Sequence, residues 1–160
     1  FSTGSLGHGL PVSVGKSLLF KKIKKKNKVF VLLSDGELNE GSTWESLLFA
    51  CHHKLDNLNI IIDNNKIQSL GLVKDIIKLE PLEDKLKSFG AKVYRCNGHN
   101  INLLKKRLLI KSKNKPKVII ADTTKGKGIS FMENNNLWHY KNPDDNELNK
   151  AIKEIEIKYA

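Results

Sequence analysis

Two short motifs bracket the part of the chain around which the rest is organised. They read SDGELNEG at residues 34–41 and IDNNK at residues 62–66. Each motif follows a short run of apolar and β-branched residues, Val29 to Leu33 before the first and Ile60 to Ile62 before the second. Runs of this length and composition are typical of buried strands. The sequence therefore predicts a strand that ends at each motif.

The residues between the two strands, Ser42 to Lys54, predict a helix. Ser42 and Glu45 have the spacing of a capping box, and apolar residues recur three and four positions apart. These apolar residues are Trp44, Leu47, Leu48 and Cys51. A strand, a helix and a second strand form a right-handed crossover within a parallel sheet. Asp35 and Asn65 would then lie together at the carboxyl edge, where open α/β sheets bind ligands.

Asp35, Gly36 and Asn65 together offer groups that suit a metal-bound phosphate. Asp35 has a carboxylate and Asn65 a carbonyl oxygen, while Gly36 lets a backbone N–H approach a ligand with no Cβ in the way. Oxygen ligands of this kind suit Mg²⁺, which fills its octahedron with water and phosphate oxygens. The alternative is that Asp-Gly and Asn-Asn only form the turns that close two strands.

The remaining sequence continues the alternation of strands and helices. We expect helices over residues 10–25, 80–89, 101–111 and 143–158, and strands over residues 91–96 and 117–124. In the last helix, Leu148, Ile152 and Ile155 are expected to face inward. The pattern predicts an α/β fold with a parallel sheet and flanking helices, in a single domain over residues 1–160.

Length and composition describe an ordinary globular protein. The chain has 160 residues, enough for one domain with a core, and 39% of them are hydrophobic. No apolar run approaches the length of a membrane span, and no signal peptide is recognisable. Cys51 and Cys96 lack metal-site spacing, and we expect both to be reduced thiols in a cytoplasmic protein.

The net charge of +11 raises the alternative of a basic α/β module that binds nucleic acid without catalysis. The lysines gather in residues 21–28, 105–107 and 111–117. Aromatic residues do not alternate with them, and arginine, the better reader of bases, occurs only at Arg95 and Arg107. A solvated lysine surface is therefore favoured over a nucleic-acid interface.

Several motifs, taken in order, resemble the thiamine-diphosphate-binding part of the transketolase family. That family carries Gly-Asp-Gly followed, at the distance seen here, by Asn-Asn or Asp-Asn. The resemblance extends to GSLGHG at 4–9, WE at 44–45, TTKGKG at 123–128 and WH at 138–139. It covers nearly the whole chain and is strongest for the split form, whose amino-terminal half is a separate polypeptide. The chain departs from the family pattern at Ser34, usually Gly, and at His8, often Gln.

The resemblance assigns a metal set and a cofactor. It implies that Mg²⁺ is bound by Asp35, Asn65 and the backbone carbonyl of Ile67, and that this ion holds the diphosphate of thiamine diphosphate. It also implies that Gly36 lets the diphosphate approach closely. The side chain of Ile67 carries no signal for such a role.

Three further site residues follow from the same resemblance. Gly4 and Leu6 would line the aminopyrimidine and thiazolium region of the cofactor. His139 matches a catalytic histidine that reaches the diphosphate and the reacting sugar. The glutamate that activates the cofactor lies in the family's pyrimidine-binding domain, and Glu40 is placed at the subunit contact instead.

The implied activity is transfer of a two-carbon glycolaldehyde (ketol) unit from a ketose phosphate to an aldose phosphate, as in the pentose phosphate pathway. The chain resembles an amino-terminal transketolase subunit that lacks its first portion and works with a carboxyl-terminal partner, in a dimer or heterotetramer. Another thiamine-diphosphate enzyme subunit, similar to deoxyxylulose-phosphate synthase or a 2-oxoacid dehydrogenase, would share Asp35 and Asn65. The segment from Glu37 to Gly41 favours transketolase over these alternatives.

Overall fold

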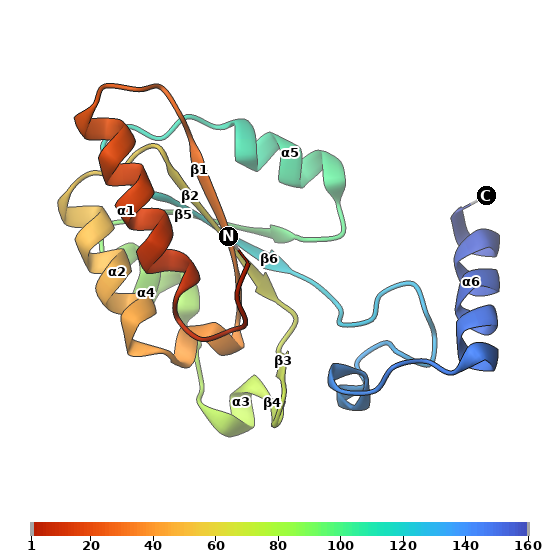
Figure 1. Ribbon diagram of the computed structural model, residues 1–160. Helices are drawn as coiled ribbons and strands as arrows, with labels where there is room; N and C mark the ends of the chain where they lie inside the picture. Colours follow the sequence, from red (N-terminus) through yellow and green to blue (C-terminus); the bar gives the residue numbers. More distant parts are fainter. Residues whose placement is uncertain (1, 160) are drawn as a thin grey trace.

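The computed structural model describes residues 2–159 and contains one parallel sheet of four strands (Figure 1). The two terminal residues of the predicted domain, Phe1 and Ala160, lie outside the described residues. The strands are β1 (Val29–Ser34), β2 (Leu58–Asn64), β5 (Lys92–Asn97) and β6 (Lys117–Asp122), and their order across the sheet is β1-β2-β6-β5. The predicted α/β fold with a parallel sheet is confirmed.

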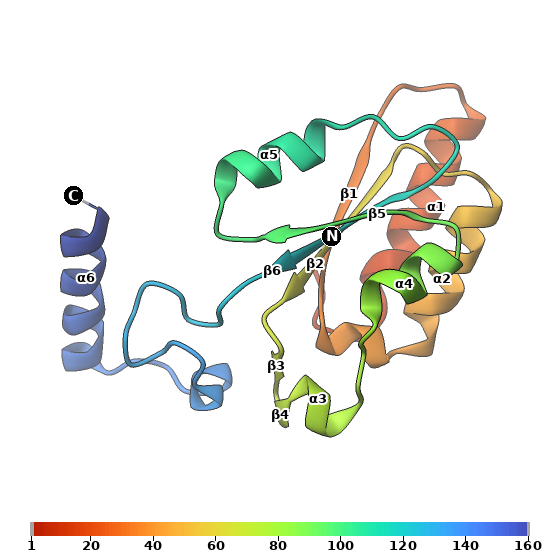
Figure 2. The same ribbon diagram turned by 180° about the vertical axis from the view of Figure 1, so that it is seen from behind.

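The helices cover the two faces of the sheet unequally (Figures 1 and 2). Three of them, α1 (Gly9–Lys22), α2 (Gly41–His52) and α4 (Leu82–Ser88), enclose the main core on one face. On the opposite face, α5 (Ile101–Leu109) packs against β5 and β6. Parallel strands are normally covered on both faces. Within residues 2–159, however, helices cover the β1 half of this sheet on one face only.

Burial along the strands follows this arrangement. β6 lies inside the sheet under helices on both faces, and its apolar residues are fully buried. In β1, alternate residues are buried and exposed, because only one face carries helices. Val31 and Leu33 enter the core, whereas Phe30 and Leu32 remain exposed.

Short elements at the carboxyl edge connect the sheet to the rest of the chain. They are η1 (Gly36–Asn39), β3 (Ile67–Gln68), β4 (Gly71–Leu72), α3 (Val73–Ile76) and η2 (Asn136–His139). After β6 the chain leaves the sheet and ends in α6 (Asp145–Tyr159), which stands apart from the other helices (Figure 1). Within residues 2–159, no helix is both long and apolar enough to cross a membrane.

Two details of the predicted helices are wrong. Ser42 does not cap α2: the N-cap is Glu40, and the Ser42 hydroxyl donates to the carbonyl of Gly7 at 2.9 Å. The apolar residues of α6 do not face inward, since Leu148, Ile152 and Ile155 are each more than 40% exposed. The helix stands apart from the sheet, so these three side chains do not reach the main core, although Ala151 of the same helix is buried.

A buried lysine holds α5 against the sheet. Lys117, at the start of β6, is 2% exposed. Its Nζ donates to the carbonyls of Arg107, Leu108 and Ile110 at 3.2, 2.6 and 2.9 Å. These are carbonyls at the end of α5 that have no partner within the helix. Lys117 therefore caps the carboxyl end of α5, and the same three carbonyls stabilise its buried ammonium group.

Candidate cofactor and metal site

A cavity of about 380 Å³ lies at the carboxyl edge of the sheet. Segments that are far apart in sequence contribute to its wall. The lining residues are Ser5, Ser34, Asp35, Gly36, Asn39, Glu40, Asn65, Ile67, Gln68, Ser69, Lys125 and His139. The cavity therefore brings together Asp35, Gly36, Asn65, Ile67 and His139, which the sequence had singled out.

Asp35 is a buried carboxylate held by backbone amides. It follows β1 directly, is 1% exposed, and accepts hydrogen bonds from the N–H groups of Gly36 at 2.7 Å and Lys66 at 2.5 Å. Lys66 has a positive φ of 68° at this position. Burial raises the pKa of Asp35 to about 6, while these two hydrogen bonds act in the opposite direction. A cation beside Asp35 would favour the ionised carboxylate.

Asn65 is fixed by its neighbours at the end of β2. Its Oδ1 accepts from the N–H of Ile67 at 3.0 Å, and its Nδ2 donates to Asp63 at 3.1 Å. Asp63 in turn accepts a hydrogen bond from the hydroxyl of Thr123, which follows β6. These contacts orient the amide, so that its oxygen and nitrogen are distinguished by their partners.

The preceding residue, Asn64, ties β2 to β6. Its Nδ2 donates to Asp122 at 2.7 Å, and Arg95 grips the same carboxylate with two hydrogen bonds of 2.9 Å. Arg95 also forms an ion pair with Glu80 at 2.9 Å. Burial would raise the pKa of Asp122, but the hydrogen bonds from Arg95 and Asn64 lower it overall. This network fixes the register of the strand ends beneath the cavity.

Gly36, Asn39 and Gln68 pack together in the cavity wall. A Cβ at Gly36 would lie 3.1 Å from the Cβ of Gln68, so one of the two residues would have to shift by a few tenths of an ångström. Asn39 donates to Gln68 at 3.2 Å, but the remaining polar atoms of the pair, Asn39 Oδ1 and Gln68 Nε2, are buried without a partner. Buried polar atoms normally have hydrogen-bond partners. An orphaned N–H of this kind suits an anionic oxygen.

The residues predicted to hold a metal ion would offer one carboxylate and neutral oxygens. Among residues 2–159, no three His, Cys, Asp or Glu side chains gather at a metal-binding distance. Asp35, the amide of Asn65 and a backbone carbonyl at Ile67 are instead hard oxygen donors, as Mg²⁺ prefers when phosphate completes its coordination. The residues present therefore fit a phosphate-bound magnesium ion better than a zinc ion, which takes nitrogen and sulfur.

The segment after β6 also contributes to the cavity lining. Lys125 and His139 both line the cavity, and His139 is stacked edge-on against Tyr140 with ring centroids 4.9 Å apart. The side chain of Asn136 donates to the carbonyl of Ser69 at 3.1 Å, which ties η2 to the hairpin after β2. The cavity thus has a lysine and a histidine in its lining together with Asp35.

Gly4 and Leu6 lie outside this wall. Gly4 lines a neighbouring cavity along β1, and Leu6 is 58% exposed. Ser5 lines both cavities, and its hydroxyl lies 2.7 Å from that of Ser34. The roles assigned to Gly4 and Leu6 stay predictions.

The family model described as "Transketolase, thiamine diphosphate binding domain" matches residues 1–158 of this chain. The chain belongs to this transketolase family. The match covers the motifs at both walls of the cavity, so the split-transketolase resemblance seen in the sequence is confirmed.

Curated relatives include components of split transketolases. The chain is 48% identical over 155 residues to an apulose-4-phosphate transketolase subunit from Actinobacillus succinogenes. It is 36% identical over 157 residues to the 6-deoxy-6-sulfo-D-fructose transketolase subunit SqwG of a Clostridium species. These matches cover 96% and 97% of this chain but 56% and 57% of the relatives. The chain thus spans little more than half the length of the curated relatives it matches.

A solved structure supports the same fold. The crystal structure of transketolase from Campylobacter jejuni matches with a TM-score of 0.90 and 31% sequence identity. The match covers 96% of this chain and 26% of that transketolase. The arrangement of one parallel sheet with flanking helices is therefore the one found in this family.

Three residues of the cavity carried no individual signal in the sequence. Lys125 belongs to a motif that was noted, but its side chain had no assigned role. Asn39 lies within the first motif and Gln68 lies two residues after the second, but nothing in their type or spacing marked them as a pair. Only the folding of β3 beside η1 brings them together.

Proposed function

We propose that this chain is the thiamine-diphosphate-binding part of a split transketolase. With Mg²⁺ and a partner chain, it would transfer a two-carbon ketol unit from a ketose phosphate to an aldose phosphate in carbohydrate metabolism. The observation that carries the proposal is the single cavity that joins Asp35, Asn65 and Ile67 with Lys125 and His139.

The residues of the cavity would have different roles in binding and catalysis. Asp35, the Asn65 amide oxygen and the Ile67 carbonyl would hold Mg²⁺, and Gly36 would leave room for the diphosphate. Bound there, thiamine diphosphate supplies the carbon nucleophile that ketol transfer requires. His139 would bind and orient a hydroxyl group of the sugar and exchange its proton. Lys125 would attract an anionic group of the cofactor or the sugar.

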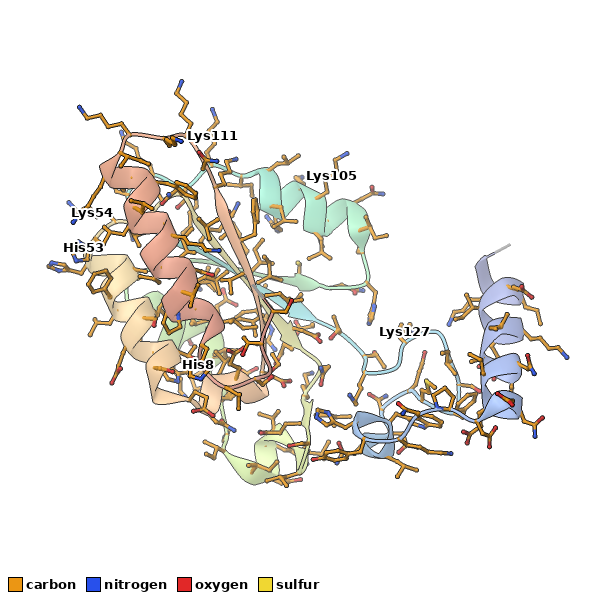
Figure 3. The ribbon with its side chains drawn as sticks, in the orientation of Figure 1. His8, His53, Lys54, Lys105, Lys111 and Lys127 are labelled. Atoms are coloured by element: carbon orange, nitrogen blue, oxygen red, sulfur yellow. The ribbon has the colours of Figure 1, made fainter. Side chains whose placement is uncertain are left out.

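The substrate class is an anionic ketose. The names of the two relatives refer to a sugar phosphate, apulose 4-phosphate, and to a sulfonated sugar, 6-deoxy-6-sulfo-D-fructose. Both carry a negative charge, and Lys125 offers a matching positive charge at the cavity. The surface lysines elsewhere add a general attraction for anions; Lys105 and Lys111 point outward from the body of the molecule (Figure 3).

The active form would need a further polypeptide. The relatives are named as subunits, and in the resembling family the cofactor-activating glutamate comes from a pyrimidine-binding domain. We propose that a carboxyl-terminal partner chain supplies it, in a dimer or heterotetramer in the cytoplasm, and that Glu40 lies at this contact.

Calorimetric titration of thiamine diphosphate tests the proposal. It would be done with and without Mg²⁺, in the presence of the candidate partner. We expect binding that requires Mg²⁺ and that is lost in Asp35→Asn and Asn65→Ala. Asp75→Asn, an exposed aspartate on α3, is the matched control and should bind like the unaltered chain. Cofactor binding that survives in both site variants would refute the assignment.

A further inference from the structure

A short turn between β5 and α5 braces the cavity from outside its lining. The turn consists of Asn97, Gly98 and His99, and it lies beside the point where the chain leaves β6 (Figures 1 and 2). These three residues are not among those that line the cavity. They contact instead the first residues after β6, which lead directly to Lys125 in the cavity wall.

Gly98 fits closely against the end of β6. Its N–H donates to the carbonyl of Asp122 at 2.7 Å. A Cβ at position 98 would lie 2.4 Å from the Cγ2 of Thr123 and 3.1 Å from the Cβ of Ala121, so a side chain there would displace Thr123. This close approach brings His99 within reach of the residue that follows Thr123.

His99 supplies a hydrogen-bond acceptor to the segment after β6. The backbone N–H of Thr124 donates to Nε2 of His99 at 2.7 Å. An N–H group can donate to Nε2 only when this nitrogen carries no proton, so the imidazole is neutral and its proton is on Nδ1. The His99 side chain is exposed, whereas Thr124 is half-buried. A side chain at the surface therefore holds the backbone that leads into the cavity.

The backbone is held on both sides of Lys125. On the amino side, His99 binds the N–H of Thr124, and on the carboxyl side the carbonyl of Lys125 accepts from the N–H of Asn134 at 2.9 Å. Gly126 follows with a positive φ of 71°, and a Cβ there would meet the backbone of the same loop at 2.4 Å. The carboxyl side is thus fixed by its own tight turn, whereas the amino side depends on His99.

The same turn supports the amide that is proposed to bind the metal ion. Gly98 packs against the methyl group of Thr123, and the hydroxyl of Thr123 donates to Asp63. Asp63 also accepts from Nδ2 of Asn65 at 3.1 Å. Because Thr123 and Thr124 are adjacent, a movement of this segment would disturb the orientation of Asn65 as well as the backbone before Lys125.

We propose that His99 is a positioning residue of the cofactor site. Its neutral Nε2 holds the N–H of Thr124, and this contact keeps the ammonium group of Lys125 at the cavity, where it attracts an anionic group. This role rests on the proposed function, because it concerns binding of the cofactor named there. The site requires an acceptor atom at the position of Nε2, and it does not require the imidazole ring itself.

NMR of the chain without cofactor tests the contact itself. In His99→Leu the acceptor is lost, and the amide of Thr124 should exchange with solvent at least about tenfold faster. In His99→Gln the side-chain oxygen can reach the position of Nε2, and slow exchange should be restored. His53→Leu is the matched control, since His53 is exposed at the end of α2 and points outward (Figure 3). Equal exchange at Thr124 in His99→Leu and the unaltered chain would overturn the proposal.

Calorimetric titration of thiamine diphosphate, with Mg²⁺ and the candidate partner, tests the consequence for the site. We expect His99→Leu to bind about threefold to tenfold more weakly, and His99→Gln and His53→Leu to bind like the unaltered chain. His99→Asn is polar but too short to reach Thr124, so it should behave like His99→Leu. This second variant keeps the test decisive if the leucine variant is not folded by circular dichroism.

The two possible failures are distinguishable. Equal affinity in His99→Leu and His99→Gln would overturn the role of His99 and leave the proposed function intact. Absence of cofactor binding by the unaltered chain would refute the proposed function and overturn this role with it.

Discussion

Replacing Asp35 with Asn should change how the stability of the chain depends on pH. Asp35 is 1% exposed, and burial raises its pKa to about 6. In the unfolded chain an aspartate titrates near its ordinary pKa of about 3.9. Because the pKa is higher in the folded chain, the stabilising contribution is complete below about pH 4 and is lost as the pH rises through about 6.

The magnitude follows from the two pKa values. A difference of about 2 pKa units corresponds to about 3 kcal/mol in the free energy of unfolding, with about 2 kcal/mol of it lost between about pH 4.5 and about pH 7.5. For a chain of this length, about 2 kcal/mol shifts the melting temperature by about 4 to 8 °C. Asn cannot ionise, so Asp35→Asn should not show this loss.

Urea denaturation, followed by circular dichroism in a chelating buffer, would measure the effect. The quantity of interest is the difference in unfolding free energy between the unaltered chain and Asp35→Asn at each pH, since the other titrating groups cancel in it. Asp75→Asn, which removes an exposed carboxylate on α3, is the control substitution. The reasoning fails if the Asp35→Asn difference stays constant to within about 0.5 kcal/mol from about pH 4.5 to about pH 7.5.

Three further substitutions test other parts of the structure. Gly36→Ala should weaken cofactor binding about tenfold in calorimetry with little loss of helix content, because the new Cβ would lie 3.1 Å from Gln68. Arg95→Met should destabilise the chain by about 1 to 3 kcal/mol in urea. It should also raise the pKa of Asp122, which the hydrogen bonds from Arg95 lower in the unaltered chain. In the unaltered chain, the lowered pKa contributes to the unfolding free energy near neutral pH, and this contribution is lost as the pH falls through that pKa. The Arg95→Met variant should lack this contribution already near neutral pH. Lys117→Met should cost about 2 kcal/mol and increase amide exchange at the end of α5; unchanged exchange there would contradict its capping role.

The strands and most helices could be read from local sequence because their burial pattern is local. Val29 to Leu33 and Ile60 to Ile62 are apolar in the way that parallel strands require, and both lie within observed strands. The predicted capping box was wrong because the Ser42 hydroxyl donates instead to the carbonyl of Gly7, which is distant in sequence. The prediction of an inward face on α6 was wrong because periodicity indicates an apolar face of a helix but not whether a core lies beside it.

The residues of the candidate site also differ in whether the local sequence predicts their positions. Asp35 and Asn65 were predictable because each follows a strand, and parallel strands end at a common edge. Lys125 and Gln68 were not predictable as wall residues, because their positions depend on how the segment after β6 and the β3–β4 hairpin fold back over that edge. Loop geometry of this kind depends on long-range contacts that a single sequence does not display.

Asn64 and Asn65 are chemically identical neighbours with opposite surroundings. Asn64 is buried against Asp122, whereas Asn65 lines the cavity. The register of β2 against β6 determines which of the two asparagines takes each position. A slip of one residue would exchange them, because side chains alternate along a strand. Accurate strand alignment is therefore a requirement of the proposed cofactor site as well as of folding. Natural selection on the proposed site should accordingly extend to Arg95 and Asp122, although neither residue lines the cavity.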